Sequence, residues 1–176
     1  ANARQVTEQI PVDQPNKEGA HIGPLSSRVQ FDKVQGLIAT GIDEGAKLVA
    51  GGLGKPEGFE TGYFVKPTVF AGVNNQMAIA REEIFGPVIS MIPFDTEAEA
   101  IAIANDTPYG LAAYFSTGDE QRAKRVAGQL RAGMISVNSA QQDYTAPFGG
   151  YKQSGNGREW GEFGFDDFLE IKGISR

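Results

Sequence analysis

The feature that most constrains the fold of this chain is an alternation of strand-like and helix-like segments between residues 88 and 138. Short apolar segments at residues 88–94, 111–116 and 134–138 have the composition of strands. Thr96 and Glu99 form a capping box before one helical segment, and Asp119 precedes a second that ends at Gly133. Helices placed between strands act as crossovers, so we expect an α/β fold with a mainly parallel sheet. Ligands of such folds bind beyond the carboxyl ends of the strands, where Asn138 is expected.

The flanking segments complete the predicted fold. An amphipathic helix is expected at residues 27–45, because apolar residues recur at helical spacing at Phe31, Val34, Ile38 and Ile42. Residues 1–26 carry three prolines and no sustained period, which predicts an irregular lead-in. The other expected elements are a strand at residues 65–73, a short helix around 158–165 and a strand at 169–174. No repeat or domain boundary is visible, and 176 residues suit one compact unit.

The absence of cysteine and the presence of a single histidine, His21, exclude several kinds of chemistry. The 176 residues offer no thiolate nucleophile and no zinc site with the usual ligands. His21 lies in the expected lead-in, with no second ligand or nucleophile near it in sequence, which indicates a surface residue. We therefore expect no metal site.

The charge and hydropathy patterns limit the partners of the chain. With 16 basic and 22 acidic residues the net charge is -6, and no basic cluster could neutralise successive phosphates. We therefore expect no nucleic acid partner. No apolar run approaches the roughly 20 residues that cross a bilayer, so no membrane insertion is expected. The first 25 residues lack the pattern of a signal peptide, which favours the cytoplasm.

Two segments, when each is taken alone, have an ordinary structural interpretation that involves no ligand. Glu82, Glu83 and Phe85 precede a strand that starts with proline, and an acidic pair in a loop is typically solvated. Phe148 is followed by glycines at 149, 150 and 155, which is typical of a tight turn. Neither this glycine-rich run nor the one at residues 51–62 matches a nucleotide-binding motif.

Taken in order, the segments of this chain resemble the aldehyde dehydrogenase superfamily from about residue 23 to the end, in the portion downstream of the catalytic cysteine. The two most specific strings are Glu82-Glu83-Ile84-Phe85-Gly86-Pro87 and Pro147-Phe148-Gly149-Gly150-Tyr151-Lys152, at this separation. Shorter shared segments are Gly23-Pro24-Leu25, Gly62-Tyr63-Phe64, Pro67-Thr68-Val69, Tyr109-Gly110-Leu111 and Val137-Asn138.

This family oxidises aldehydes to acids with NAD or NADP. A cysteine thiolate attacks the carbonyl, hydride passes to the nicotinamide, and a glutamate activates the water that hydrolyses the thioester. The resemblance implies that Glu83 binds the nicotinamide ribose and that Phe85 packs near the nicotinamide. Gln30 and Lys33 match helix positions that reach the other ribose.

The resemblance also assigns two residues near the C-terminus. Phe148 matches the aromatic residue that lines the aldehyde funnel, where an apolar wall helps to exclude water. Glu159 matches a carboxylate that assists a proton relay in this family. Residues 27–168 are then part of the catalytic domain, and residues 169–176 form an oligomerisation strand that pairs across subunits of a homodimer or homotetramer.

In this family the cysteine nucleophile, the general-base glutamate and the dinucleotide-binding sheet lie upstream of the matching region. We therefore expect the chain to be a fragment of an NAD(P)-dependent aldehyde dehydrogenase, inactive by itself. The alternative is a non-enzymatic binding or assembly protein that reuses the same scaffold.

Overall fold

The computed structural model describes residues 2–175, and the chain forms two compact units that meet in sequence between Phe94 and Asp95. We call the units before and after this point unit 1 and unit 2. The expectation of one compact unit without a boundary is wrong. An alternation of strands and helices does not show which strands pair, and here the strands pair within two separate sheets.

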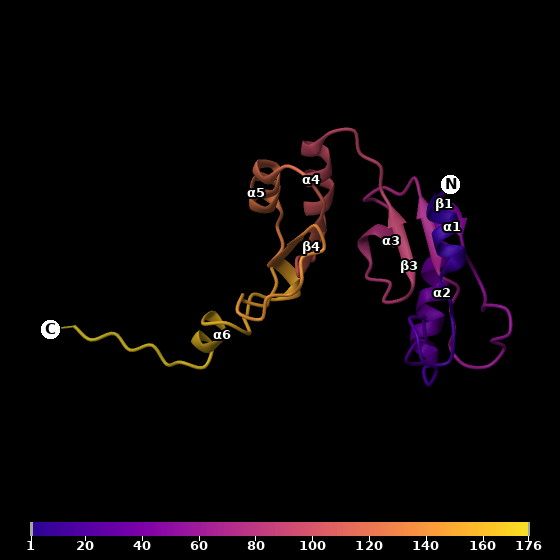
Figure 1. Ribbon diagram of the computed structural model, residues 1–176, viewed down its shortest axis with the longest axis horizontal. Helices are drawn as coiled ribbons and strands as arrows, with labels where there is room; N and C mark the ends of the chain where they lie inside the picture. The colour runs from indigo at the N-terminus through magenta and orange to yellow at the C-terminus, as the bar shows by residue number, and fades with distance from the viewer. Residues whose placement is uncertain (1, 176) are drawn as a thin grey trace. The chain divides into compact units, whose positions relative to one another are not determined.

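Unit 1 is built on a three-stranded sheet, of order β1-β2-β3. It contains β1 (Lys47–Ala50), β2 (Thr68–Ala71) and β3 (Val88–Met91), and Figure 1 labels β1 and β3. β2 pairs parallel with β3 and antiparallel with β1, with an irregular register between Leu48 and Ala50. The sequence predicted β2 and β3. β1 was not predicted, because a four-residue strand that begins with lysine and ends with alanine carries little strand signal.

The helices of unit 1 are α1 (Asn2–Gln9), α2 (Arg28–Asp43) and α3 (Ala78–Arg81). The irregular lead-in expected at residues 1–26 therefore contains a helix. α1 lies against β1 and β2, and Arg4 Nε donates a hydrogen bond to the Val49 carbonyl at 2.8 Å. The one residue that α1 buries is Thr7, so the sequence has no apolar stripe that would predict this helix.

The core of unit 1 lies between α2 and the sheet. Val34 and Ile38 of α2 and Phe70 of β2 are completely buried, as the predicted apolar stripe of α2 requires. Ile42, the last residue of that stripe, is 39% exposed near the end of the helix. Each buried side chain of this size stabilises the fold by about 1.5–3 kcal/mol, so this cluster gives unit 1 its own source of stability.

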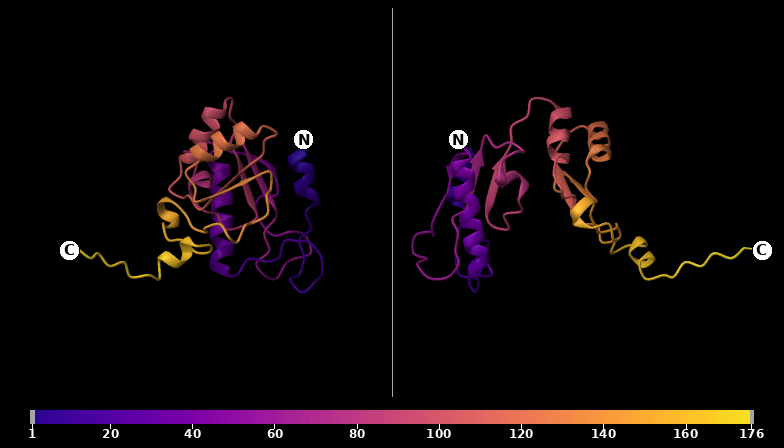
Figure 2. Two further views of the ribbon diagram at one scale, coloured as in Figure 1. Left: turned by 60° about the vertical axis from the view of Figure 1, so that its left-hand side comes forward. Right: turned by 180° about the vertical axis from the view of Figure 1, so that it is seen from behind.

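Unit 2 contains two parallel strands, β4 (Ala112–Phe115) and β5 (Met134–Val137), connected through α5 (Glu120–Gln129). α4 (Glu97–Asn105) precedes β4 and lies beside α5 in both Figure 1 and Figure 2. The predicted caps are present, since the Thr96 hydroxyl accepts from the Glu99 N–H at 3.2 Å and the Asp119 carboxylate accepts from two N–H groups of α5. This crossover confirms the predicted α/β class with parallel pairing.

The C-terminal part of unit 2 contains a short 3-10 helix, η1 (Lys152–Ser154), and α6 (Phe163–Asp166). Beyond α6 the chain is drawn out without helix or strand, and residues 169–175 form no β pairing (Figure 2). The strand predicted at residues 169–174 is therefore absent from the described chain. A strand needs a partner for its backbone hydrogen bonds, and none is provided within the described residues.

Candidate functional site

The turn that connects α3 to β3 carries Glu83 and Phe85. Ile84, between them, is 8% exposed and belongs to the core of unit 1, so it anchors the turn. Phe85 has a positive φ of 57° and a side chain that is 70% exposed. The Glu83 side chain is also exposed. The turn therefore presents a carboxylate and an aromatic ring to solvent on either side of a buried anchor.

α2 brings Gln30 and Lys33 against this turn. The helix begins after Ser27, whose hydroxyl accepts from the Gln30 N–H at 3.2 Å. Gln30 Nε2 donates to the carbonyls of Ile84 and Phe85, both at 3.0 Å. Lys33 Nζ donates to the Glu83 carbonyl at 2.8 Å. The structure thus brings the four predicted cofactor residues together in unit 1. The two residues of α2 lie about fifty positions before the two residues of the turn.

The two remaining predicted residues, Phe148 and Glu159, are neighbours in unit 2. They form an isolated antiparallel bridge in which each N–H donates to the other carbonyl at 2.7 Å. The Phe148 ring lies 4.7 Å from the ring of Trp160, measured between centroids, and Trp160 lies 4.9 Å from Tyr144. Trp160 has a positive φ of 65°, and its side chain is only partly exposed.

Trp160 and Tyr144 were not identified from the sequence. Trp160 is the only tryptophan of the chain and directly follows Glu159, which is the one sequence signal that could have drawn attention to it. Its contact with Tyr144 joins residues 16 positions apart through a loop of irregular structure, and no periodicity predicts such a contact. The three rings of Tyr144, Trp160 and Phe148 form what we call the aromatic row.

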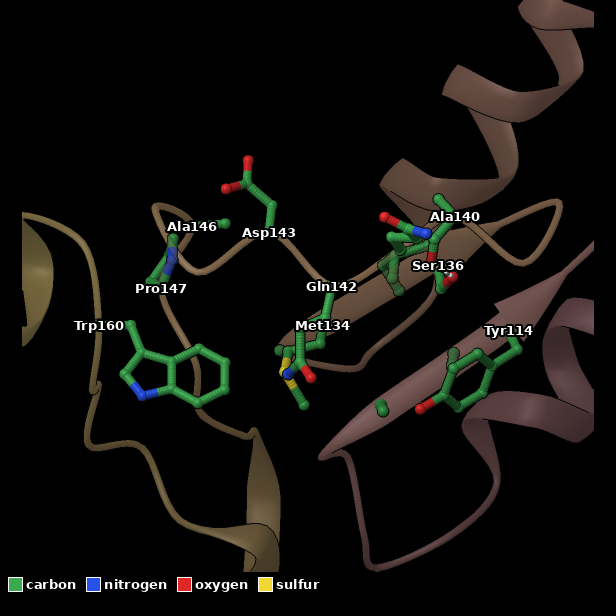
Figure 3. A pocket seen from close by; sticks show the side chains of 14 residues that line it. Tyr114, Met134, Ser136, Ala140, Gln142, Asp143, Ala146, Pro147 and Trp160 are labelled. Carbon is green, nitrogen blue, oxygen red and sulfur yellow. Dashed lines mark hydrogen bonds between the residues drawn. The ribbon is translucent and has the colours of Figure 1, made fainter. Parts of the chain in front are cut away.

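A cavity of about 600 Å³ opens beside the aromatic row. Figure 3 shows the indole of Trp160 on one side of this cavity and the ring of Tyr114 on the other, with Met134 and Gln142 between them. Asp143 also lines it, and its carboxylate accepts from the Thr145 hydroxyl at 2.6 Å, a bond that lowers the pKa of Asp143 below its usual value. The cavity is largely apolar at its strands and polar along the loop after β5.

The loop after β5 begins with Asn138, which also has a positive φ, of 55°. Its side-chain amide accepts from the Thr117 N–H at 2.8 Å and donates to the Thr117 carbonyl at 2.9 Å. The sequence placed Asn138 at a strand end where ligands bind. In the structure its side chain joins the ends of β4 and β5, so its polar groups serve the geometry of the loop.

Glycines fix the path of the segment around Phe148. A Cβ atom on Gly133, at the start of β5, would overlap the carbonyl oxygen of Gly149, and a Cβ atom on Gly149 would overlap the carbonyl oxygen of Gly157. The Arg158 guanidinium donates to the carbonyls of Gly150 and Gly157, both at 2.9 Å. The turn predicted here is therefore a crossing of backbones that only glycine permits.

No group of three or more histidine, aspartate or glutamate side chains that could hold a metal ion occurs among residues 2–175. Within the same residues, no helix is long and apolar enough to cross a membrane. The printed sequence contains no cysteine.

Comparison with known sequences gives a consistent family match. The sequence profile of the aldehyde dehydrogenase family matches residues 1–174. A 3-succinoylsemialdehyde-pyridine dehydrogenase of a Pseudomonas species is 56% identical over 172 residues, which are 98% of this chain and 36% of that protein. A putative aldehyde dehydrogenase of Staphylococcus aureus strain USA300 is 51% identical over 99% of this chain and 37% of its own length. The chain therefore spans just over a third of the curated relatives that it matches.

Solved structures match as well. A mutant of aldehyde dehydrogenase C from Pseudomonas syringae, in complex with NAD+ and octanal, superposes with a TM-score of 0.92 at 50% identity, over 96% of this chain and 35% of that chain. An aldehyde dehydrogenase of Mycobacterium tuberculosis, in complex with NAD+, has a TM-score of 0.89 at 51% identity, over 93% of this chain and 34% of its own. The similarity begins at the first residues rather than near residue 23, so the segment expected as a lead-in belongs to the shared fold.

Proposed function

Because the chain belongs to the aldehyde dehydrogenase family, we propose that the protein containing these residues oxidises an aldehyde to a carboxylic acid, with NAD or NADP as the hydride acceptor. The balanced reaction consumes one aldehyde, one water and one oxidised cofactor, and it yields the acid, the reduced cofactor and a proton. The observation that carries this proposal is the turn at Glu83–Phe85, which presents an exposed carboxylate and an exposed ring and is hydrogen-bonded to α2. The NAD+ complexes of the relatives support the choice of cofactor.

The residues of the turn suit the nicotinamide half of the cofactor. An ionised carboxylate is a double acceptor, so Glu83 can receive hydrogen bonds from both hydroxyls of a ribose. The exposed Phe85 ring can pack against a flat heterocycle and limit its movement. When bound, the dinucleotide would supply the acceptor of the hydride. By the resemblance, Gln30 and Lys33 would reach the other ribose, and the remaining contacts of the adenosine half are assigned to residues outside this chain.

The aromatic row suits the aldehyde. Phe148 and Trp160 together offer an apolar wall, which favours an apolar aldehyde side chain and excludes water while the hydride leaves. The Glu159 side chain is exposed, and its backbone is held to Phe148, so a proton accepted by its carboxylate can pass on to solvent. Glu159 is accordingly proposed as a proton relay.

The nucleophile of the proposed reaction is a cysteine that forms a thiohemiacetal with the aldehyde, and these 176 residues contain no cysteine. By the resemblance, the general-base glutamate is also assigned to the upstream region. Two observations support this assignment: the chain spans 36% of a closely similar relative, and the octanal complex is that of a mutant with a cysteine replaced by alanine. This chain alone is expected to show no turnover.

We also propose that the protein is a cytoplasmic homodimer or homotetramer in which residues 169–174 pair with a neighbouring subunit. Ile171 is 97% exposed and Ile174 is 82% exposed, so the segment has apolar side chains to bury in a partner. Sedimentation velocity of the complete protein tests the assembly, and a monomer would contradict it.

The decisive experiment measures cofactor reduction by the complete protein with a panel of aliphatic and aromatic aldehydes. Reduction with at least one aldehyde is expected, and replacing the upstream cysteine by alanine should abolish it. Glu83→Gln should raise the KM for the cofactor about tenfold or more, because a charged acceptor is lost. The matched control is Glu82→Gln, a neighbouring exposed carboxylate outside the proposed contacts. Absence of reduction with every aldehyde would instead favour a non-enzymatic binding or assembly protein.

A further inference from the structure

Two side chains from the N-terminal half of α2 donate hydrogen bonds to the backbone of the turn at residues 83–85. Gln30 and Lys33 are three residues apart and so lie on one face of the helix. Their side chains donate to the three consecutive carbonyls of Glu83, Ile84 and Phe85, at 2.8, 3.0 and 3.0 Å. A side-chain amide has two N–H donors, and the hydrogen bonds to Ile84 and Phe85 engage the Gln30 nitrogen with two acceptors.

The turn has a backbone conformation that needs such a support. Phe85 has a φ of 57°, which costs free energy in a residue with a side chain and persists only where its surroundings fix it. The exposed ring cannot provide that support by packing. Gly86 lies so close to Val34 of α2 that a Cβ atom would approach the Val34 methyl group to 2.8 Å. α2 therefore holds the turn on both sides of Phe85.

We propose that Gln30 and Lys33 are positioning residues, which hold Glu83 and Phe85 in the geometry that receives the nicotinamide half of the cofactor. This inference rests on the proposed function and deepens it. It differs from the role implied by the resemblance, in which the two side chains reach the other ribose of the cofactor. Here the atoms that would make that contact already hold the turn.

The expected benefit is preorganisation. A carboxylate and a ring that are in place before the cofactor arrives do not have to be ordered when it binds, so less binding free energy is lost. Loss of either side chain should then leave the turn more mobile before binding and weaken the binding of the nicotinamide half. Binding of the adenosine half should not change.

The test uses the complete protein and two variants with unbranched side chains of similar length that cannot donate, Gln30→Met and Lys33→Met. The first measurement is amide hydrogen exchange at residues 82–86 without cofactor, and faster exchange is expected in both variants. The second is the dissociation constant of NAD+, expected to rise about tenfold, as follows from the loss of one or two hydrogen bonds. The third is the dissociation constant of ADP, expected to change by less than about twofold, because ADP lacks the nicotinamide half.

Two further variants serve as controls. Lys33→Arg retains a cationic donor and should restore most of the NAD+ affinity, as a positioning role requires. Asp32→Asn changes the neighbouring residue of α2, whose carboxylate is paired with Arg28 at 2.9 Å and does not contact the turn, and it should alter none of the three measurements. The thermal unfolding midpoints of all variants show whether the fold is retained.

The outcomes separate the inference from the proposed function. Equal weakening of ADP and NAD+ would show direct contact with the adenosine ribose and would overturn the inference. Unchanged exchange at residues 82–86 would overturn it as well. If the wild-type protein neither binds nor reduces NAD+ or NADP+, the proposed function fails and the cofactor role with it, while the exchange measurement still decides whether the two side chains hold the turn.

Discussion

Units 1 and 2 differ in how they enclose their apolar side chains. In unit 1, Val34, Ile38 and Phe70 are 0% exposed and form the centre of a continuous cluster. In the described part of unit 2, the most buried apolar side chains are Val126, at 8%, and Ala132, at 9%, and α4 buries none of its residues. Burial of apolar area is the main source of stability, so unit 2 gains much less from its own core.

Unit 2 relies instead on polar links. Glu97 of α4 pairs with Arg122 at 3.0 Å and with Arg125 at 2.9 Å, and both arginines belong to α5. Lys152 Nζ donates to the carbonyls of Asn105 and Thr107, at 2.8 and 3.0 Å. Such links define geometry but contribute little free energy at an exposed surface. The turn proposed to bind the cofactor therefore rests on the core of unit 1, whereas the aromatic row proposed to bind the aldehyde depends on polar and glycine contacts.

The largest effect that would test this comparison is expected from Phe70→Ala in unit 1. Removing a completely buried aromatic side chain should lower the free energy of unfolding by about 3–5 kcal/mol. Denaturant unfolding of these 176 residues with amide exchange in β2 measures it, while the fluorescence of Trp160, their only tryptophan, reports unit 2 separately. The control Ile89→Ala removes a side chain that is 59% exposed and should change stability by about 0.5 kcal/mol. Equal losses in the two variants would refute the buried core.

A smaller effect is expected from Gly133→Ala in unit 2. The new methyl group would overlap the Gly149 carbonyl, and forcing it in should cost about 1–3 kcal/mol or more. The Trp160 emission should then shift as the aromatic row is displaced. Gly128→Ala is the matched control, because Gly128 lies within α5 with open space around it, and alanine there should stabilise the helix by about 0.5–1 kcal/mol. Similar results for both glycines would show that the backbone crossing is unimportant.

The smallest effect concerns pH. Hydrogen bonding to Arg125 holds the pKa of the Glu97 carboxyl below its ordinary value of 4.5. A lowered folded-state pKa means that folding favours the ionised form, so this contribution is complete above the ordinary value and is lost as pH falls through the lower one. Unfolding of unit 2 followed by Trp160 should become slightly easier in that acidic range, and Glu97→Gln should reduce this dependence. A variant with the full acid dependence of wild type would contradict the assignment.

The sequence predicted what is decided locally. The caps at Thr96 and Asp119 were found because each side chain bonds to N–H groups two or three residues away. α1 and β1 were missed because their stability comes from contacts with distant strands. The boundary after Phe94 was missed because the alternation of strands and helices does not reveal which strands pair. The pairing is what separates the two sheets.

The same distinction applies to the candidate site. Glu83, Phe85 and Phe148 were found because they stand within specific sequence strings, and their roles remain predictions. The hydrogen bonds from Gln30 and Lys33 to the turn join residues 50 to 55 positions apart, so no local sequence pattern predicts them. Trp160 was missed for the same reason, because its neighbours in space are set by an irregular loop.

The glycine crossing at the start of β5 also limits how this protein can evolve. The space that a side chain on Gly133 would need is filled by the backbone of Gly149, and the space beside Gly149 is filled by the backbone of Gly157. Replacing one of these glycines before a second change compensates would be costly, because the first change would already displace the segment that carries Phe148. At the proposed aldehyde site, the side chains of the aromatic row can therefore change more easily than the path of the backbone beneath them.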